Sequence, residues 1–125
     1  MAKRAALYVE HLMQAIANIE TDIAGHDLDS FRSDRRTRQL VERNLEILSE
    51  ASRRLPEAFK DEEPGIDWPA IAGIGNVLRH DYHASQPAIL WETGTRDLKL
   101  LKAAVQRIRD RLKERKQAGS ETDDA

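Results

Sequence analysis

The sequence predicts an all-α fold, an antiparallel bundle of four to five helices. Apolar residues recur at helical spacings between glycine and proline breaks, and no segment alternates polar and apolar residues as a strand does. The charged fraction of 34% is what the outer faces of amphipathic helices require. A chain of 125 residues fits one domain. We predict a helical domain over residues 1–117 and a disordered tail over 118–125.

The first two helices are predicted on either side of a polar loop, residues 24–34. The first runs over about 4–23, ends before Gly25, and places Leu12, Ile16, Ile19 and Ile23 in one stripe. The second runs over about 34–55 and ends at Pro56. Its core face holds Val41, Leu45, Leu48, Ser52 and Leu55, and is broadened by Leu40, Ile47 and Ala51.

A connector, 56–66, with at most one helical turn, leads to a third helix over about 68–80. Asp67 is its predicted N-cap, and Pro69 fits the first turn. Gly73 and Gly75 lie inside this helix, where each costs about 1 kcal/mol relative to alanine. Such a pair predicts a closely packed neighbour or a site that needs room.

The last part of the domain is predicted as a short helix over 86–92 and a long final helix capped by Thr95. Apolar residues in the final helix alternate spacings of three and four, as in an antiparallel bundle seam. They are Leu98, Leu101, Val105, Ile108 and Leu112.

Composition limits the function classes. The net charge is −2, so nucleic-acid binding requires a local basic patch. No apolar run approaches the roughly 20 residues of a membrane span, and the N-terminus lacks a signal-peptide core. The absence of cysteine fits a reducing compartment. We therefore expect a soluble, cytoplasmic protein with no membrane partner.

Residues 73–83, GIGNVLRHDYH, carry the unusual polar groups. In a continuing helix Asn76, His80 and His83 share one face, with Arg79 and Tyr82 nearby. A histidine is favoured at a helix C-terminus and titrates near neutrality. From spacing alone, surface histidines beside a core tyrosine are the alternative interpretation. A His-x-x-His pair without a third ligand predicts no metal site, and no other cofactor is predicted.

Four segments together resemble the HepT-like branch of the HEPN superfamily. They are VERNLEILSEASRRLP at 41–56, IDWPAIAGIGN at 66–76, RHDYH at 79–83 and ILWETGTRDLKLLK at 89–102. The resemblance covers roughly residues 8–112. It implies an all-α HEPN domain that forms a homodimer and acts on RNA.

The resemblance also implies an activity and a partner. Members of the family are typically toxins of type VII-like toxin–antitoxin systems, metal-independent endoribonucleases that a MntA-like nucleotidyltransferase antitoxin neutralises by AMPylation. The family motif maps onto Asn76, His80 and Tyr82, and Tyr82 stands at the position that receives AMP. The motif arginine should precede the asparagine, but Gly75 stands there.

The resemblance assigns roles to the polar cluster. His80 would act as acid and base, and Asn76 would bind phosphate or orient His80. Arg79 is the best available cation, but its neighbour His80 lies about 100° away on the helix. We therefore expect Arg79 to reach the missing arginine's place only across a dimer interface.

Other basic residues are weaker candidates. His83 and Arg43 are possible supporting residues, and Arg53 and Arg54 are further cations. Solvated faces or salt bridges explain each arginine equally well. Because Gly75 replaces the motif arginine, a second hypothesis stays open, in which the chain is a catalytically inactive module that dimerises and binds a nucleotidyltransferase.

Overall fold

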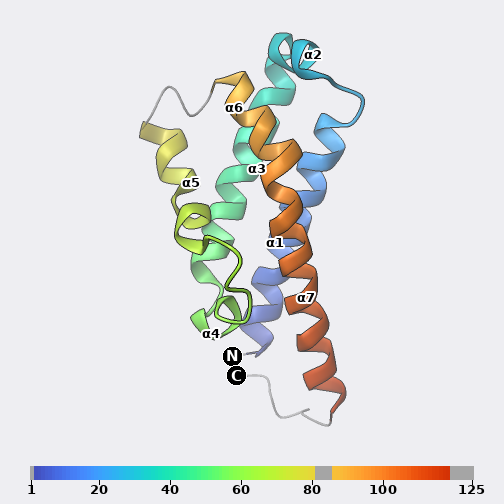
Figure 1. Ribbon diagram of the computed structural model, residues 1–125, viewed down its shortest axis with the longest axis vertical. Coiled ribbons are helices and arrows are strands. Elements are labelled where there is room, and N and C mark those ends of the chain that lie inside the picture. The colour runs from blue at the N-terminus through green and yellow to red at the C-terminus, as the bar shows by residue number, and fades with distance from the viewer. Residues whose placement is uncertain (1, 81–85, 119–125) are drawn as a thin grey trace.

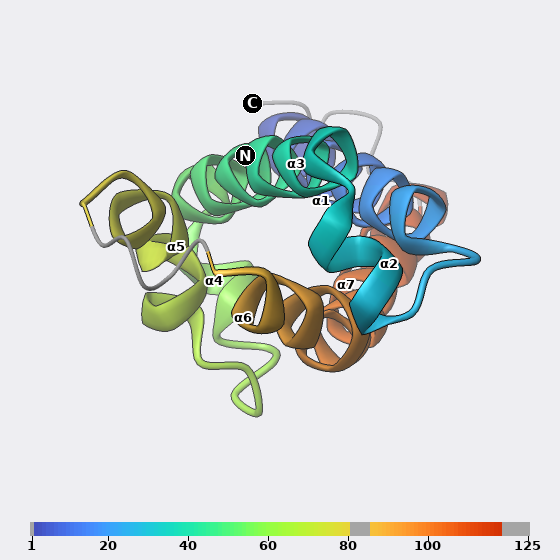
Figure 2. The ribbon, with the colours of Figure 1, turned by 90° about the horizontal axis from the view of Figure 1, so that it is seen from above.

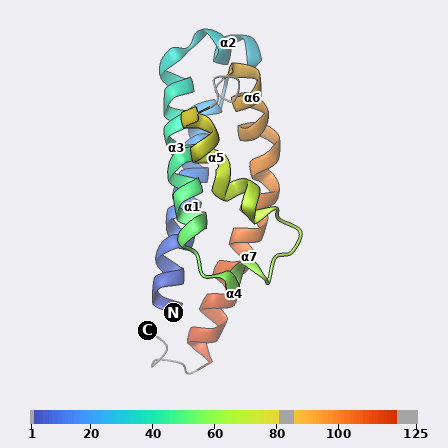
Figure 3. The same ribbon diagram turned by 90° about the vertical axis from the view of Figure 1, so that its left-hand side faces the viewer.

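Four helical segments run alternately up and down the long axis of the molecule (Figures 1 and 3). The computed structural model describes residues 2–80 and 86–118. The segments are α1 (Ala2–Ile23), α3 (Arg35–Arg54), α5 (Trp68–His80) and a final stretch made of α6 (Pro87–Glu92), the π-helical turn η2 (Thr93–Asp97) and α7 (Leu98–Gln117). Two short helices, α2 (Leu28–Ser33) and α4 (Glu57–Lys60), lie in the connections.

The order of packing is α5, α3, α1, α7. Viewed from above, α3 lies between α1 and α5, and α7 packs on α1 (Figure 2). The predicted apolar stripes meet in the core, where Leu12, Leu45, Leu48, Leu101 and Ile108 are buried. The all-α fold predicted from the sequence is therefore confirmed. Among the described helices, none is both long and apolar enough to cross a membrane.

The helix boundaries agree with the sequence predictions at most ends. The Asp67 carboxylate accepts from the Ala70 amide at 3.1 Å, which confirms the N-terminal cap of α5. The connector after Pro56 contains the single helical turn α4. The five seam residues of α7 are all buried.

The predicted loop over 24–34 is wrong in part, because it contains α2. Asp27 forms a capping box with Ser30, and Phe31 is fully buried against Trp91 at a ring-centroid distance of 5.2 Å. A six-residue helix with one buried apolar residue has too little periodicity to be seen in a sequence. Leu40 also differs from its prediction, since it is 49% exposed and lies outside the core face of α3.

Thr95 is not the N-cap of the last helix. Its hydroxyl donates back to the Trp91 carbonyl at 2.7 Å, inside a continuous run from α6 through η2 to α7. The extra residue of the π-turn lets Gly94 pack against Ile19 of α1, where an added Cβ would lie 3.3 Å from the Ile19 side chain. The chain therefore passes from α6 to α7 without a break.

Candidate functional site

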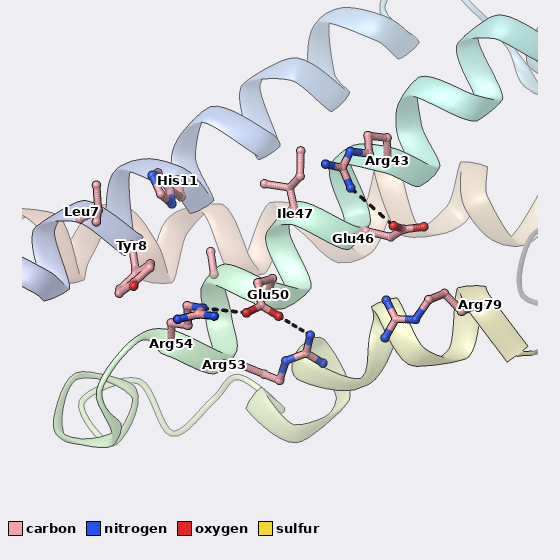
Figure 4. Close-up of a pocket in the computed structure, with 11 residues that line it drawn as sticks. Leu7, Tyr8, His11, Arg43, Glu46, Ile47, Glu50, Arg53, Arg54 and Arg79 are labelled. Atoms are coloured by element: carbon pink, nitrogen blue, oxygen red, sulfur yellow. Dashed lines mark hydrogen bonds and ion pairs between the residues drawn. The ribbon is translucent and has the colours of Figure 1, made fainter.

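A groove of about 460 Å³ runs along α3 between α1 and α5 (Figure 4). Residues of α3 at spacings of three and four form its floor, as expected for one face of a helix. We call it the arginine groove; it is lined by Leu7, Tyr8, His11, Arg43, Glu46, Ile47, Glu50, Ala51, Arg53, Arg54 and Arg79. It is the local basic patch that the overall charge of the chain did not indicate.

Glu50 organises two of the arginines. Its carboxylate accepts from Arg53 at 2.5 Å and from the Nε of Arg54 at 2.6 Å. Arg53 also donates to the Ala72 carbonyl of α5 at 3.0 Å. Arg53, followed by Arg54, lowers the pKa of Glu50 because both guanidiniums stabilise its charged form.

The groove retains an excess of positive charge. Four guanidiniums face two carboxylates, and the second carboxylate, Glu46, lies 3.7 Å from Arg43. A guanidinium has five N–H donors in a planar fork, so these ion pairs leave donors free for an anion. The groove is therefore suited to phosphate groups.

Arg79 occupies the space that the motif arginine would enter. A Cβ added to Gly75 would lie 3.3 Å from Nη1 of Arg79, because residues 75 and 79 are four apart and share a helix face. The expectation that Arg79 could reach this place only from a second chain is wrong. The position of Arg79 relative to Gly75 decides this, and its angle to His80 does not. Within residues 2–80 and 86–118, no side-chain hydrogen bond or ion pair holds Arg79.

Ser49 fixes α5 against α3 at this point. The buried Ser49 hydroxyl donates to the Ala72 carbonyl at 2.7 Å and accepts from the Gly75 amide at 3.1 Å. A Cβ at Gly75 would lie 3.3 Å from this oxygen, so Gly75 permits the close approach. Gly73 has open space around it, with nothing within 4 Å. Packing within the chain thus explains one glycine of the pair.

The structure places the predicted site residues in two groups. Arg79 and Arg43 line the arginine groove. Asn76 and His80 are exposed on the adjoining face of α5 and do not line it. Tyr82 and His83 lie outside the described residues.

Sequence reasoning missed the contribution of α1. Tyr8 and His11 reach the groove from one turn of that helix, and their rings meet edge to face at a centroid distance of 5.7 Å. Tyr8 lies four residues before Leu12 and packs partly against the core, so its spacing predicts a core residue, whereas His11 lies off the apolar stripe. Their approach to α3 depends on tertiary packing.

The fold and the groove define the class of this protein, an all-α helical bundle with a groove lined by four arginines. Comparison with known proteins gives the family. Residues 12–108 match the family model described as "Ribonuclease HepT-like". The chain belongs to the HepT-like ribonuclease family, as its motifs predicted.

Two relatives illustrate the similarity. The probable ribonuclease HepT of Thermococcus cleftensis is 33% identical over 102 residues, covering 82% of this chain and 93% of the relative. A putative RNase of Caldanaerobacter subterraneus subsp. tengcongensis is 30% identical over 101 residues, covering 81% and 90%. No solved structure shows a significant match.

Proposed function

We propose that this chain is the toxin of a two-gene, type VII-like toxin–antitoxin system and acts in the cytoplasm as a metal-independent endoribonuclease. The observation that carries the proposal is the guanidinium of Arg79 above Gly75, one helical turn from the position of the missing arginine and next to His80. Membership of a ribonuclease family supports RNA as the substrate. Arg79 then supplies the cation that Gly75 cannot.

The proposed reaction needs a base and a cation. His80 removes the proton of a ribose 2′-hydroxyl, whose oxygen attacks the adjacent phosphorus. The bond from phosphorus to the 5′-oxygen breaks, and protonated His80 returns its proton to that oxygen, which yields a 2′,3′-cyclic phosphate and a free 5′-hydroxyl. Arg79 stabilises the negative charge that builds on the phosphoryl oxygens, and Asn76 binds phosphate or orients His80.

Homodimerisation is part of the proposal. The exposed face of α5 carries Asn76, His80 and the unobstructed backbone of Gly73, and a two-fold contact on this face would bring two His80 side chains into one cleft. Light scattering should show a dimer at micromolar concentration. A strict monomer at that concentration would exclude this arrangement.

We propose Tyr82 as the site where a MntA-like nucleotidyltransferase antitoxin attaches AMP. Tyr82 follows His80 by two residues in the sequence, so the modification would add negative charge and a bulky base close to the proposed acid and base, which would oppose the binding of RNA phosphates. Co-expression with a MntA-like nucleotidyltransferase should raise the intact mass by one or more AMP groups, and Tyr82→Phe should abolish the increase. An unchanged mass beside a transferase active on other substrates would count against this site.

The second candidate function is a catalytically inactive module that dimerises and binds a nucleotidyltransferase. The replacement of the motif arginine by Gly75 favours it. The two functions predict different results when cleavage of single-stranded RNA is measured in the presence of EDTA. Cleavage by the wild-type protein that His80→Ala abolishes supports the nuclease. Equal cleavage by both proteins, or none by either at high concentration, supports the binding module.

A further inference from the structure

We infer that Tyr8, His11 and Arg54 form a nucleotide-binding subsite for single-stranded RNA. The subsite lies in the arginine groove, which His80 does not line. That the ligand is RNA rests on the proposed function. The subsite itself rests on the geometry of the arginine groove, where the exposed ring of His11, the half-buried ring of Tyr8 and the guanidinium of Arg54 lie together (Figure 4). Neither ring belongs to the motif that identifies the family.

The two rings form a corner open to the groove. Tyr8 and His11 are three residues apart on α1, and their planes are inclined at 82°. His11 is exposed and Tyr8 is half-buried. A base can stack on one ring while its edge meets the other, and such stacking accepts any base sequence. Rings held in this way on a helix lose little freedom when a base binds.

Arg54 lies beside this corner and is oriented by Glu50. The bond to Glu50 uses Nε alone, which leaves donors of the terminal NH₂ groups for a phosphate. Tyr8 and Arg54 lie next to each other at one end of the groove (Figure 4). Consistent with this arrangement, Glu50, followed by the Tyr8 hydroxyl, raises the pKa of Arg54. A base-binding surface and a phosphate-binding group are therefore adjacent, as recognition of one nucleotide requires.

The length of the groove favours a polymer over a free nucleotide. Arg43 and Arg54 are eleven residues apart on α3, which corresponds to about 16 Å along the helix axis. Arg79 faces the same groove from α5. A strand whose scissile phosphate lies near Arg79 can extend along α3 to the subsite. An acidic peptide would use the arginines but would gain nothing from the rings.

The test measures binding without cleavage. A fluorescein-labelled single-stranded oligonucleotide with 2′-O-methyl groups throughout lacks the attacking hydroxyl, so its affinity is independent of catalysis. Anisotropy titrations at several salt concentrations compare wild-type protein with Arg54→Gln, Tyr8→Ala and Tyr8→Phe. Arg96→Gln is the matched control, because Arg96 is also exposed and also pairs with a glutamate at helical spacing, Glu92, but lies outside the groove.

We expect Arg54→Gln to weaken binding about tenfold and to reduce the slope of log K against log salt by about 0.7. Tyr8→Ala should weaken binding roughly 5- to 100-fold, whereas Tyr8→Phe, which keeps the ring, should stay within about twofold. Arg96→Gln should also stay within about twofold. His11→Ala provides a second ring deletion at an exposed position if Tyr8→Ala does not fold.

Three results would overturn the subsite: no binding by the wild-type protein, equal weakening by Arg54→Gln and Arg96→Gln, or full affinity in folded variants that lack either ring. Polyglutamate that competes as well as RNA at equal charge would also overturn it, in favour of an acidic peptide. Binding that depends on Arg54 and Tyr8 in a protein without ribonuclease activity would refute the proposed function and leave the subsite standing.

Discussion

Two clusters of arginines lie on different helices of the bundle, one along α3 and the other along α7, and their guanidiniums have different roles. In the arginine groove, Glu50 and Glu46 form ion pairs with three arginines. Arg79 has no ion-pair partner within the described residues. In the second cluster, the turn after α4 reaches α7 (Figure 3), where Glu62 and Glu63 bind three arginines. We call this the α7 ion-pair cluster; it consists of Glu62, Glu63, Arg107, Arg111 and Arg115.

The burial of the carboxylates distinguishes the two clusters. The Glu63 side chain is 8% exposed, with bonds of 2.7 Å from Arg107 and 2.6 Å from Arg111. The Glu50 side chain is 46% exposed. A buried carboxylate that needs its arginines for solvation belongs to the fold, whereas arginines around an exposed carboxylate keep donors for a ligand. Arginine count alone would not separate these roles.

Replacing a glutamate by glutamine should destabilise the protein to a different extent in the two clusters. Glu63→Gln should lower the free energy of unfolding by about 2 kcal/mol, because charged hydrogen bonds to two arginines are lost at a mostly buried site. Glu50→Gln should lower it by less than about 1 kcal/mol, since exposed ion pairs contribute little. Urea denaturation of the two variants and the wild-type protein measures both. Equal losses would show that burial does not distinguish the clusters.

The α7 ion-pair cluster should also make the stability of the protein depend on pH. Arg107 first, and Arg111 less strongly, lower the pKa of Glu63, while for Glu62 the effects of Arg115 and Arg111 together outweigh the opposite effect of burial. A carboxylate with a lowered folded-state pKa stabilises the protein above its ordinary value of 4.5 and loses that contribution as the pH falls through the folded-state value. Stability should therefore be steady from pH 7 to about 5 and decline below about 4.5.

Glu63→Gln provides the control for this decline. The variant should lose stability less steeply below pH 4.5, by up to about 1.4 kcal/mol per pH unit, because one titrating group is gone. Thermal melts at half-unit steps of pH measure the slope. An unchanged slope would mean that other carboxylates account for the acid sensitivity.

The smallest predicted effect concerns the two glycines of α5. Gly73→Ala should raise the free energy of unfolding by roughly 0.5–1 kcal/mol, because helix propensity improves and the new Cβ meets nothing within 4 Å. Gly75→Ala should gain less or lose stability, because its Cβ lies 3.3 Å from both Ser49 and Arg79. Equal stabilisation by both substitutions would show that Arg79 and Ser49 do not crowd Gly75.

Much of the fold was predictable from local patterns. The stripes of α1, α3 and α7 and the cap of α5 follow from spacings of three and four and from Asp67, so their cause lies within each segment. The helix α2 and the π-turn were not predictable, because Phe31 and Gly94 are fixed by contacts with Trp91 and Ile19 from other segments.

The candidate site was predictable only as far as its motif. Spacing along α5 marked Asn76, Arg79 and His80, and the four-residue spacing of Gly75 and Arg79 already predicts that they share a helix face. The packing of Ser49 of α3 against Gly75 could not be predicted in this way, because it joins two helices. The positions of Tyr8 and His11 on α1 do not predict that they line a groove, because the groove exists only after α1 and α3 pack. Contacts between residues of different helices can be identified only from the structure.

The most direct test of the account is the cleavage rate of single-stranded RNA in EDTA by Arg79→Gln and Arg96→Gln beside the wild-type protein. Both substitutions remove one exposed positive charge, but only Arg79 lies over Gly75. We predict that Arg79→Gln lowers the rate roughly 10²- to 10³-fold, as for the loss of a transition-state contact, and that Arg96→Gln leaves it within about twofold. Equal rates for the two variants would contradict the assignment of Arg79 as the replacement for the motif arginine.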